Sequence, residues 1–219
     1  RLADGEYDAF VTAGSTGAAV MGSTFIVKRI KGVKRAALAP IMPSAKKGIM
    51  VIDIGANAEC RPEMLVQFGL MSSIYMEYAE KVKSPKVGLL NIGVEETKGT
   101  PLQLEAYRML KKAPLNFIGN IEAREVPSGN CDIIVTDGFS GNIVLKLTEG
   151  VALYLFGMVK SAFKTNAKTK LAAALMMPQL KQLKKKMDYT EYGGAPLIGI
   201  SKPVIKAHGS SDANALKNA

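Results

Sequence analysis

The stretch CDIIVTDGFSGN, residues 131–142, changes abruptly from an apolar run to a turn of glycines and small polar residues. The apolar half is short and unalternating, as expected of a strand that is buried on both faces of a parallel sheet. The same change occurs three more times, from YDAFVTAG to STGAAVMG, from GIMVIDIG to ANAEC and from KVGLLNIG to VEETKG. These four runs predict four parallel strands.

Helical patterns follow these strands. Residues 62–83 have a proline near the first turn and apolar residues at helical spacing, namely Met64, Leu65, Phe68, Met71, Ile74, Tyr75 and Tyr78. Residues 142–163 carry a similar stripe of Ile143, Leu147, Val151, Tyr154, Leu155 and Met158. Strands that alternate with helices predict an α/β fold, with a mostly parallel sheet sandwiched by helices.

The composition places the chain among globular proteins. Its 219 residues are 47% hydrophobic and 22% charged, which is enough to bury a core, and we expect one α/β domain over residues 1–219 with an appendage. The chain starts at Arg1 with no apolar run behind a basic start, so no signal peptide is visible. Two cysteines without a CxxC motif and a single histidine exclude a disulfide framework and a Cys/His zinc site, so we expect no metal and a cytoplasmic location.

The net charge of +10 has a local origin. Residues 160–187 contain eight lysines and no acidic residue, whereas the other 21 basic residues nearly balance the 19 acidic ones. The lysine-rich stretch contains one aromatic residue, Phe163, and no arginine. Because single-stranded nucleic acids are bound by interleaved basic and aromatic side chains, we expect no nucleic-acid partner.

The four loops that end the predicted strands are the candidate binding site. Ligands of open parallel sheets bind beyond the carboxyl ends of the strands, where glycines let the backbone approach and helix N-termini attract anions. The polar side chains at this edge are Ser15, Thr16, Asn57, Glu59, Asn91, Glu95, Glu96, Thr97, Lys98, Asp137, Ser140 and Asn142. They suit a small anion, although each glycine taken alone can equally serve a tight turn.

Together these motifs resemble one family. In order, VTAGSTGA, IDIGANAEC, LLNIGVEETKG, NFIGNIEAR, VTDGFSGNIVLK, YGGAPLIG and VIKAHGSSDA are similar to motifs of the PlsX family of bacterial phosphate acyltransferases, from about Tyr7 to the last residue. The resemblance implies a fold like that of phosphotransacetylase and the isopropylmalate dehydrogenases. It also implies transfer of a fatty acyl group from acyl-acyl carrier protein to inorganic phosphate, in phospholipid synthesis, without a cofactor. The family's N-terminal portion is expected to be absent from this chain.

The implied reaction assigns roles to the loop residues. Lys98 is expected to neutralise phosphate or stabilise the oxyanion, His208 to lie at a helix start that binds phosphate, and Asp137 to orient another donor. Each also has a structural alternative, such as a solvated lysine or a helix cap. The expected substrate-binding residues are Gly14, Ser15, Thr16, Gly17, Asn57, Asn91, Gly93, Glu96, Thr97, Gly138, Ser140, Asn142, Gly209, Ser210 and Ser211. Cys60 and Cys131 are chemically able to accept an acyl group, but burial in the core is the favoured interpretation.

The lysine-rich stretch KTNAKTKLAAALMMPQLKQLKKKM predicts a helical hairpin over about residues 160–188, with two helices broken at Pro178. Its apolar tip is too short to span a bilayer, which needs about 20 residues. Lysines beside an apolar tip are typical of a surface that rests on anionic lipid, and the expected contacts are Leu171, Leu175, Met176 and Met177. The hairpin can also form a homodimer or attract the acidic carrier protein, and both are compatible with membrane contact. The opposing interpretation is an ordinary solvated hairpin. The family resemblance implies homodimers and peripheral membrane attachment.

Three other functions compete with the acyltransferase. A phosphotransacetylase would act on acyl-CoA rather than on the carrier protein. A membrane-docked scaffold would bind phosphate or carrier protein without turnover. A dehydrogenase of the related fold would need clustered aspartates for a divalent metal, and this sequence has only scattered acids.

Overall fold

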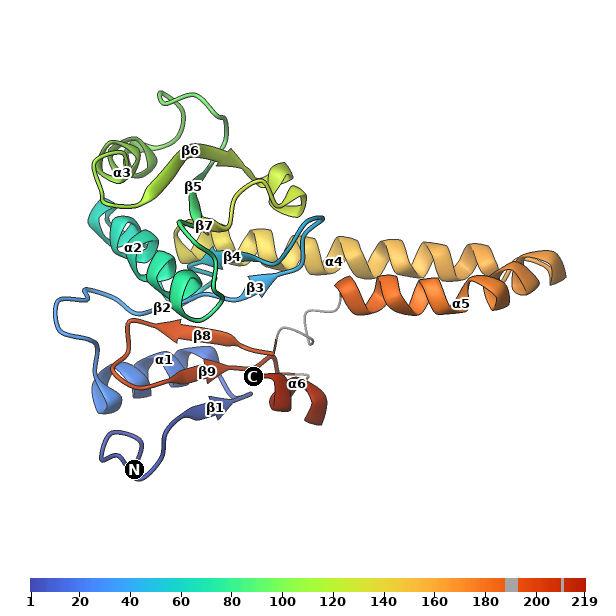
Figure 1. Ribbon diagram of the computed structural model, residues 1–219, viewed down its shortest axis with the longest axis horizontal. Coiled ribbons are helices and arrows are strands. Elements are labelled where there is room, and N and C mark those ends of the chain that lie inside the picture. Colours follow the sequence, from blue (N-terminus) through green and yellow to red (C-terminus); the bar gives the residue numbers. More distant parts are fainter. Residues whose placement is uncertain (188–192, 210) are drawn as a thin grey trace.

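The computed structural model describes residues 1–187, 193–209 and 211–219, and its core contains two sheets (Figure 1). The larger sheet has the order β3-β4-β7-β5-β6, and its strands are parallel except for β3. The strands are β3 (Ile41–Met42), β4 (Ile49–Ile52), β7 (Ile133–Val135), β5 (Lys86–Asn91) and β6 (Asn116–Glu122). This mixed, mostly parallel sheet confirms the predicted α/β class.

Helices cover both faces of the larger sheet because its central strands are apolar on both sides. Helices α2 (Pro62–Tyr78) and α3 (Pro101–Leu110) pack on one face, where Phe68 contacts a cluster that includes Ile52 and Val135. The first turns of α4 (Gly138–Phe163) and the 3₁₀ helix η2 (Ala123–Ser128) pack on the other face. There Val51 and Ile134 lie at the alternate strand positions, as the two-residue period of a strand requires.

The smaller sheet has the order β1-β9-β8-β2. Its strands are β1 (Phe10–Thr12), β9 (Val204–Lys206), β8 (Ala195–Ile198) and β2 (Ala37–Leu38), and only the β1–β9 pair is parallel. Helix α1 (Thr16–Gly22) follows β1 and continues into the π-helical turn η1 (Ser23–Val27), and the chain ends with α6 (Ala213–Asn218). The run that ends in VTAG therefore does not share a sheet with the other three predicted strands.

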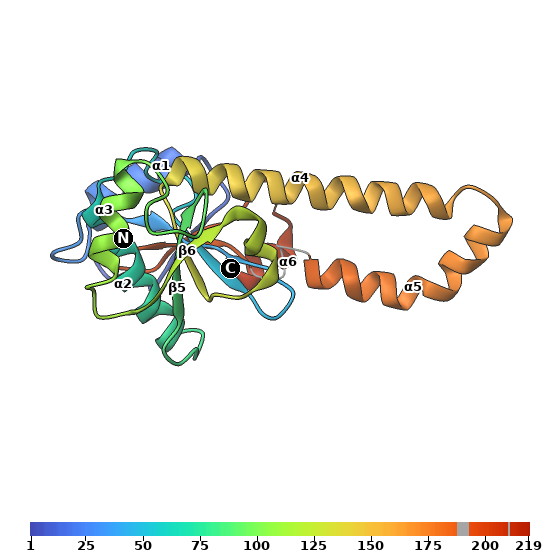
Figure 2. The same ribbon diagram turned by 90° about the horizontal axis from the view of Figure 1, so that it is seen from above.

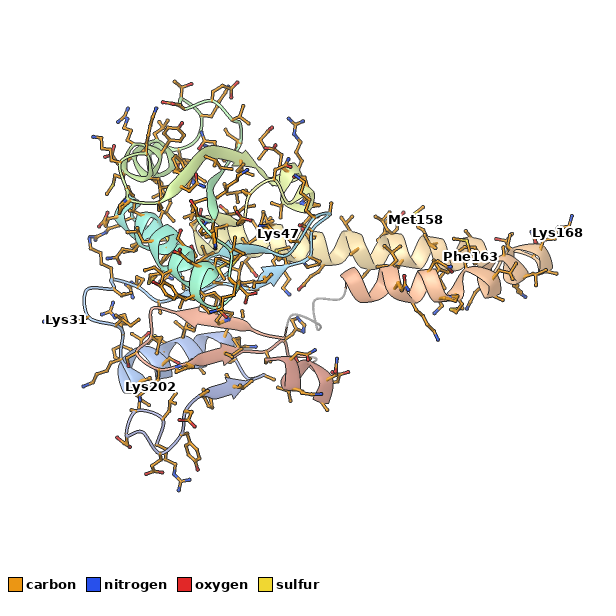
Figure 3. All side chains as sticks on the ribbon, viewed as in Figure 1. Lys31, Lys47, Met158, Phe163, Lys168 and Lys202 are labelled. Atoms are coloured by element: carbon orange, nitrogen blue, oxygen red, sulfur yellow. The ribbon has the colours of Figure 1, made fainter. Side chains whose placement is uncertain are left out.

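Helix α4 and helix α5 (Ala167–Met187) form a long antiparallel hairpin that extends away from both sheets (Figure 2). Residues 164–166 connect the two helices at the far end of the hairpin. Met158, Phe163 and Lys168 therefore lie far from the sheets (Figure 3). The hairpin is therefore longer than the predicted appendage, because its first arm is most of α4.

The prediction that two helices break at Pro178 is wrong. Pro178 lies inside α5, and Figure 2 shows that this helix bends along its length without being interrupted. A proline removes one backbone hydrogen bond and displaces the preceding turn, and an exposed helix accommodates this as a kink. The segment LAAALMMP is consequently part of the second arm and not the tip of the hairpin.

The apolar stripe of α4 is largely exposed. Leu147, Tyr154 and Met158 have exposed fractions of 64%, 67% and 53%. By length and composition, α4 is the one helix among the described residues that could cross a membrane. These two properties alone do not distinguish a membrane span from a helix whose stripe is covered by a partner.

Candidate functional site

The segment TDGFSGN, residues 136–142, connects β7 to α4, and its backbone passes close to the chain that follows β4. Asp137 caps the helix, because its Oδ1 accepts a hydrogen bond from Ser140 N at 2.8 Å and its Oδ2 accepts one from Ser140 Oγ at 2.9 Å. A Cβ on Gly138 would lie 2.5 Å from the carbonyl oxygen of Asn57, and a Cβ on Gly141 would overlap the carbonyl oxygen of Asp53. Both glycines are therefore required to place the first turn of α4 against the end of β4.

Asp53 connects the two sheets at the same point. Its carboxylate accepts hydrogen bonds from the backbone of Leu38 at 2.9 Å, of Ala56 at 3.1 Å and of Asn57 at 2.6 Å, and from the side-chain amide of Asn57 at 3.0 Å. Burial raises the pKa of Asp53, and these hydrogen bonds oppose that effect. Because Leu38 belongs to β2 and Asp53 follows β4, this side chain fixes one sheet relative to the other.

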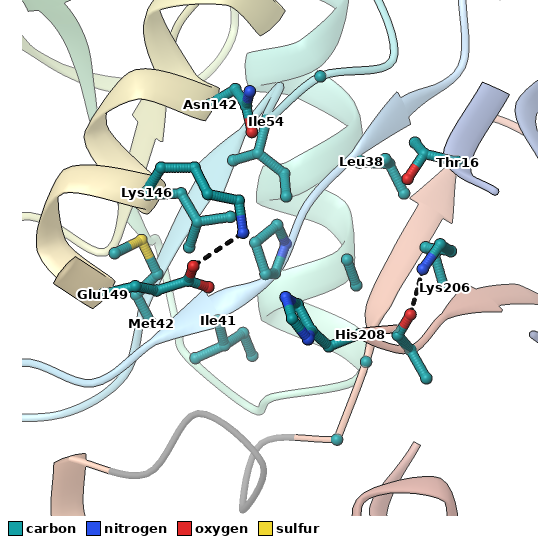
Figure 4. A pocket seen from close by; sticks show the side chains of 17 residues that line it. Thr16, Leu38, Ile41, Met42, Ile54, Asn142, Lys146, Glu149, Lys206 and His208 are labelled. Atoms are coloured by element: carbon teal, nitrogen blue, oxygen red, sulfur yellow. Dashed lines mark hydrogen bonds and ion pairs between the residues drawn. The ribbon is translucent and has the colours of Figure 1, made fainter. Parts of the chain in front are cut away.

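A cavity of about 290 Å³ lies beside this junction (Figure 4). Helix α4, the segment from β2 to β3, the end of β4 and strands β8 and β9 all contribute to its lining. Its walls are mainly apolar and include Leu38, Pro40, Ile41, Met42, Ile54 and Leu145. Such a cavity, with a few convergent polar groups, is the usual form of a small-molecule site.

The polar groups of the cavity are mostly cationic or neutral. Lys146 and Glu149, one turn apart on α4, form an ion pair of 2.8 Å between Nζ and Oε2. Lys206 enters from β9, and its ammonium donates a hydrogen bond to the carbonyl oxygen of Ala207. Burial and the positive charge of Lys146 lower the pKa of Lys206. Because Glu149 neutralises the charge of Lys146, the positive charge that favours an anion in the cavity is that of Lys206.

Comparison with known proteins identifies the family. The profile described as "Fatty acid synthesis protein" matches residues 1–219. This chain belongs to that family. Relatives called phosphate acyltransferase from Alkaliphilus oremlandii and Clostridium tetani are each 54% identical over 212 residues, which is 97% of this chain but only 63% and 64% of the relatives. The chain thus spans somewhat less than two thirds of their length.

Solved structures share the fold. A phosphotransacetylase from Streptococcus pyogenes aligns with a TM-score of 0.65 at 17% identity, over 99% of this chain and 62% of that protein. A phosphotransacetylase from Staphylococcus aureus aligns with a TM-score of 0.60 at 15% identity, over 99% and 62% of the two chains. The expected likeness to phosphotransacetylases is confirmed at the level of the fold.

Three of the predicted site residues line the cavity of this family member. Thr16 enters from the start of α1, Asn142 from the first turn of α4 and His208 from the end of β9. Gly138 and Ser140 lie in the adjacent turn, and Gly14, Ser15 and Gly17 surround Thr16. Asn57 has a structural task, because its amide donates to the carbonyl oxygen of Ala36 at 2.8 Å as well as to Asp53.

The loop that contains Lys98 does not line this cavity. Asn91 holds the loop, since its amide donates to the carbonyl oxygen of Lys98 at 2.9 Å. Gly93 is buried in the loop, whereas Thr97 and Lys98 are exposed. Glu96 forms an ion pair of 2.8 Å with Lys111. The pKa of Glu96 is lowered mainly by the hydrogen bond from Lys111 and, to a smaller extent, by one with Tyr107.

The C-terminal motif differs from its prediction in one respect. We expected His208 and Gly209 at a helix start, but α6 begins at Ala213 with Asp212 as its N-cap. His208 instead accepts a hydrogen bond at its carbonyl oxygen from Ser211 N, at 3.0 Å. The hydroxyl of Ser211 is buried without a hydrogen-bond partner in the described part of the chain, and Ser210 lies outside it.

Sequence reasoning missed Lys146, Glu149 and Lys206. The pair on α4 has the i,i+3 spacing of an ion pair, which on its own indicates only a solvated helix face. Lys206 had a stronger signal. In the run VIK, Val204 is a core residue, and side chains two positions apart on a strand point to the same face. A lysine on the core-facing side of a strand needs a partner or a ligand.

The environment of both cysteines disfavours the nucleophilic thiolate form. Burial raises the pKa of Cys60 to about 12, with the carboxylate of Asp53 as a second cause, and burial raises the pKa of Cys131 to about 12. Thiols with such values remain protonated near neutral pH. Among the residues that the structure describes, no three His, Cys, Asp or Glu side chains are grouped to hold a metal ion.

Proposed function

We propose that this chain carries the catalytic part of a phosphate acyltransferase, which transfers a fatty acyl group from acyl-acyl carrier protein to inorganic phosphate. The observation that carries the proposal is the cavity beside α4, in which an apolar wall adjoins cationic and hydrogen-bonding groups. This combination suits a substrate with an acyl chain at one end and a phosphate at the other. The names of the relatives that span this chain support the same activity.

The reaction needs positioning more than a protein nucleophile. A phosphate oxygen attacks the thioester carbonyl carbon, a C–O bond forms, the C–S bond breaks, and the thiolate leaves and takes a proton. Donors that are fixed around the carbonyl oxygen stabilise the negative charge that develops there. Thr16, Asn142 and His208 are the predicted residues that line the cavity, and Asp137 positions the helix turn that carries Asn142.

Lys98 remains a proposed catalytic residue whose loop must approach the cavity in the complete site. The side chain of Lys98 is exposed, so it can extend from the loop, whereas the hydrogen bond from Asn91 to its backbone would have to move with the loop or break. Lys98→Ala should therefore lower turnover. Lys112→Ala, which also removes an exposed lysine, is the control. Equal turnover by both variants would remove Lys98 from the mechanism.

The hairpin is the proposed contact surface for partners. Leu171, Leu175, Met176 and Met177 are all exposed on α5, beside a run of lysines. Each lysine near an anionic surface contributes about 1 kcal/mol, and apolar side chains add to this when they enter the lipid. We propose a cytoplasmic enzyme that is peripherally attached to the membrane, forms homodimers through the hairpin, and attracts the acidic carrier protein with the same lysines.

Membrane attachment is tested by vesicle flotation. Leu175→Glu should reduce binding to vesicles that contain anionic lipid, because a charge on an apolar contact surface opposes insertion. Gln179→Glu adds the same charge at another exposed position of α5 and serves as the control. If the two variants bind vesicles equally, general charge and not the apolar surface controls attachment.

The activity itself is tested by trapping the product. The protein is incubated with long-chain acyl-acyl carrier protein and phosphate, acyl phosphate is trapped with hydroxylamine, and free carrier protein is measured. Phosphate-dependent release with formation of hydroxamate is the expected result. Turnover with short acyl-CoA but not with acyl-carrier protein would identify a phosphotransacetylase. Binding of carrier protein or phosphate without hydroxamate would identify a scaffold.

A further inference from the structure

Lys206 occupies a position that the packing of the chain does not explain. It is half-buried on β9, its backbone pairs with Thr12 of β1 and Ala195 of β8, and its side chain lies on the face that carries the core residue Val204. Strand β9 lies between β1 and β8, so the ammonium of Lys206 is partly removed from water. The lowered pKa of Lys206 reflects this loss of hydration. Such a position costs stability unless something compensates for it.

No carboxylate that the structure describes pairs with Lys206 to supply that compensation. The ion pairs of the described residues do not include Lys206, and its ammonium donates to one neutral group, the carbonyl oxygen of Ala207. The carboxylate of the same cavity, Glu149, is engaged with Lys146. Figure 4 shows the two lysines on different sides of the cavity, with His208 between their elements.

We propose that Lys206 binds the tetrahedral phosphate group of the reaction, either as inorganic phosphate or as the phosphoryl group of the acyl phosphate product. This inference rests on the proposed function and adds a residue to it. A phosphate near Lys206 replaces the lost hydration with charge-assisted hydrogen bonds. The apolar residues Leu38, Ile41, Met42, Ile54 and Leu145 line the same cavity and would contact the acyl chain.

The positions of the two lysines favour Lys206 over Lys146 for this role. Lys146 is half-exposed and already neutralised by Glu149, so it gains little from a further anion. Lys206 is more buried and lacks a carboxylate partner among the described residues, so an anion there is less screened by water.

The test measures phosphate binding and turnover in four proteins: the unsubstituted chain, Lys206→Met, Lys206→Arg and Lys202→Met. Lys206→Met keeps the apolar stem and removes the charge, whereas Lys206→Arg keeps the charge. Lys202 lies on the exposed turn just before β9 and is the matched control (Figure 3). Calorimetric titration with inorganic phosphate gives affinity, hydroxamate trapping gives turnover, and thermal unfolding without phosphate reports on the fold.

Lys206→Met should weaken phosphate binding by about tenfold to a hundredfold, which corresponds to the loss of one or two charge-assisted hydrogen bonds. Lys206→Arg should retain most of the affinity, and Lys202→Met all of it. The unfolding temperature of Lys206→Met in the absence of phosphate should be equal or higher, because a desolvated charge has been removed. A purely structural lysine would give the opposite pattern, with a lower unfolding temperature and unchanged affinity.

A second titration separates the two sources of the phosphate group. A non-hydrolysable acyl phosphonate carries the same tetrahedral anion with an acyl chain, so if Lys206 holds the product, Lys206→Met should weaken phosphonate binding too. If only inorganic phosphate binding is affected, Lys206 holds the substrate alone. Unchanged affinity for both ligands would overturn the inference even if acyl phosphate is formed. Absence of hydroxamate together with Lys206-dependent phosphate binding would instead reject the proposed function and retain the anion site.

Discussion

At the scale of single residues, the two glycines of GFSG have a different role from Gly150, later in the same helix. A Cβ at Gly141 would overlap the carbonyl oxygen of Asp53 and lie 2.8 Å from Cγ2 of Thr136, whereas a Cβ at Gly150 meets nothing within 4 Å. Gly141→Ala should therefore lower the free energy of unfolding by about 2–4 kcal/mol through overpacking. Gly150→Ala should raise it by about 0.5–1 kcal/mol, because alanine costs less conformational entropy in a helix.

Urea unfolding of the two alanine variants distinguishes these effects, since both add the same methyl group to α4. Lower activity of Gly141→Ala is also expected, because the shift of the first turn moves Asn142 in the cavity. Similar stability of the two variants would mean that α4 approaches β4 less closely than the structure indicates.

The cysteines give a prediction that depends on pH. The pKa of Cys60 and of Cys131 is raised from 9.0 to about 12, in both cases mainly by burial. At pH 8 the native thiols should therefore react with iodoacetamide about a thousandfold more slowly than the same thiols in urea, because only the thiolate reacts. The folded state favours the protonated thiols, so their contribution to stability is complete below pH 9 and is lost between pH 9 and about 12.

The matched variants for this prediction are Cys60→Ala and Cys131→Ala, and each reports the rate of the remaining thiol by mass spectrometry. Both variants should retain acyl transfer if phosphate attacks the thioester directly. Rapid labelling of native Cys60 at pH 8, together with loss of turnover in Cys60→Ala, would contradict the direct mechanism and indicate a covalent acyl-enzyme.

At the scale of secondary-structure elements, Pro178 weakens α5 without ending it. The proline cannot donate a hydrogen bond to the carbonyl oxygen of Ala174, so the turn that precedes it is held less firmly. Pro178→Ala should increase the protection of the amides of this turn against hydrogen exchange, by up to about 3 kcal/mol in local opening free energy. Gln179→Ala, at the next exposed position, is the control and should have little effect. Unchanged protection in Pro178→Ala would place the weak point elsewhere in α5.

The elements that sequence patterns predicted well are those whose burial is independent of distant partners. Strands β4, β5 and β7 are apolar on both faces and were recognisable from their composition. The smaller sheet was not recognisable from the sequence. Its strand β2 has only two residues, too few to show a hydrophobic period, and it pairs with β8, which is far along the chain. Pro178 misled the prediction because its cost, although real, is smaller than the stabilisation of a long continuous helix.

The candidate site was only partly predictable for a related reason. Thr16, Asn142 and His208 belong to glycine-rich motifs, which mark positions where the backbone must turn. The cavity itself is formed by side chains from β2, α4 and β9 that are distant in the sequence, and no local pattern assembles them. Lys206 becomes noticeable only when its strand is known to face the core. Asp53 was overlooked for a related reason. Its hydrogen bonds from Ala56 and Asn57 are local, but the one from Leu38, which joins it to the smaller sheet, depends on the contact between the two sheets.

At the scale of the whole molecule, the hairpin has an apolar surface that no other described part of the chain covers. Ile143, Leu147, Val151, Tyr154 and Met158 follow one another at intervals of three and four residues along α4, and all are exposed. A surface of this kind is rare on a monomer and is typical of an interface. A second copy is the occupant we expect, because two such stripes placed antiparallel would bury apolar side chains from both molecules in one symmetric contact.

Sedimentation velocity over a range of protein concentrations tests this homodimer. The unsubstituted chain is expected to be a dimer and Tyr154→Glu a monomer, because the glutamates of both copies would be buried in the same symmetric interface. Lys168→Glu changes the net charge more than Tyr154→Glu does, but it lies at the end of the hairpin and leaves the apolar stripe intact, so this variant should remain dimeric. If Tyr154→Glu remains dimeric while its binding to anionic vesicles falls, the stripe contacts lipid rather than a second copy.

Because α4 also carries Asn142 at its first turn, loss of the dimer should lower acyl transfer as well if the interface stabilises that end of the helix. A monomeric variant with full turnover would show that the cavity is complete in a single chain.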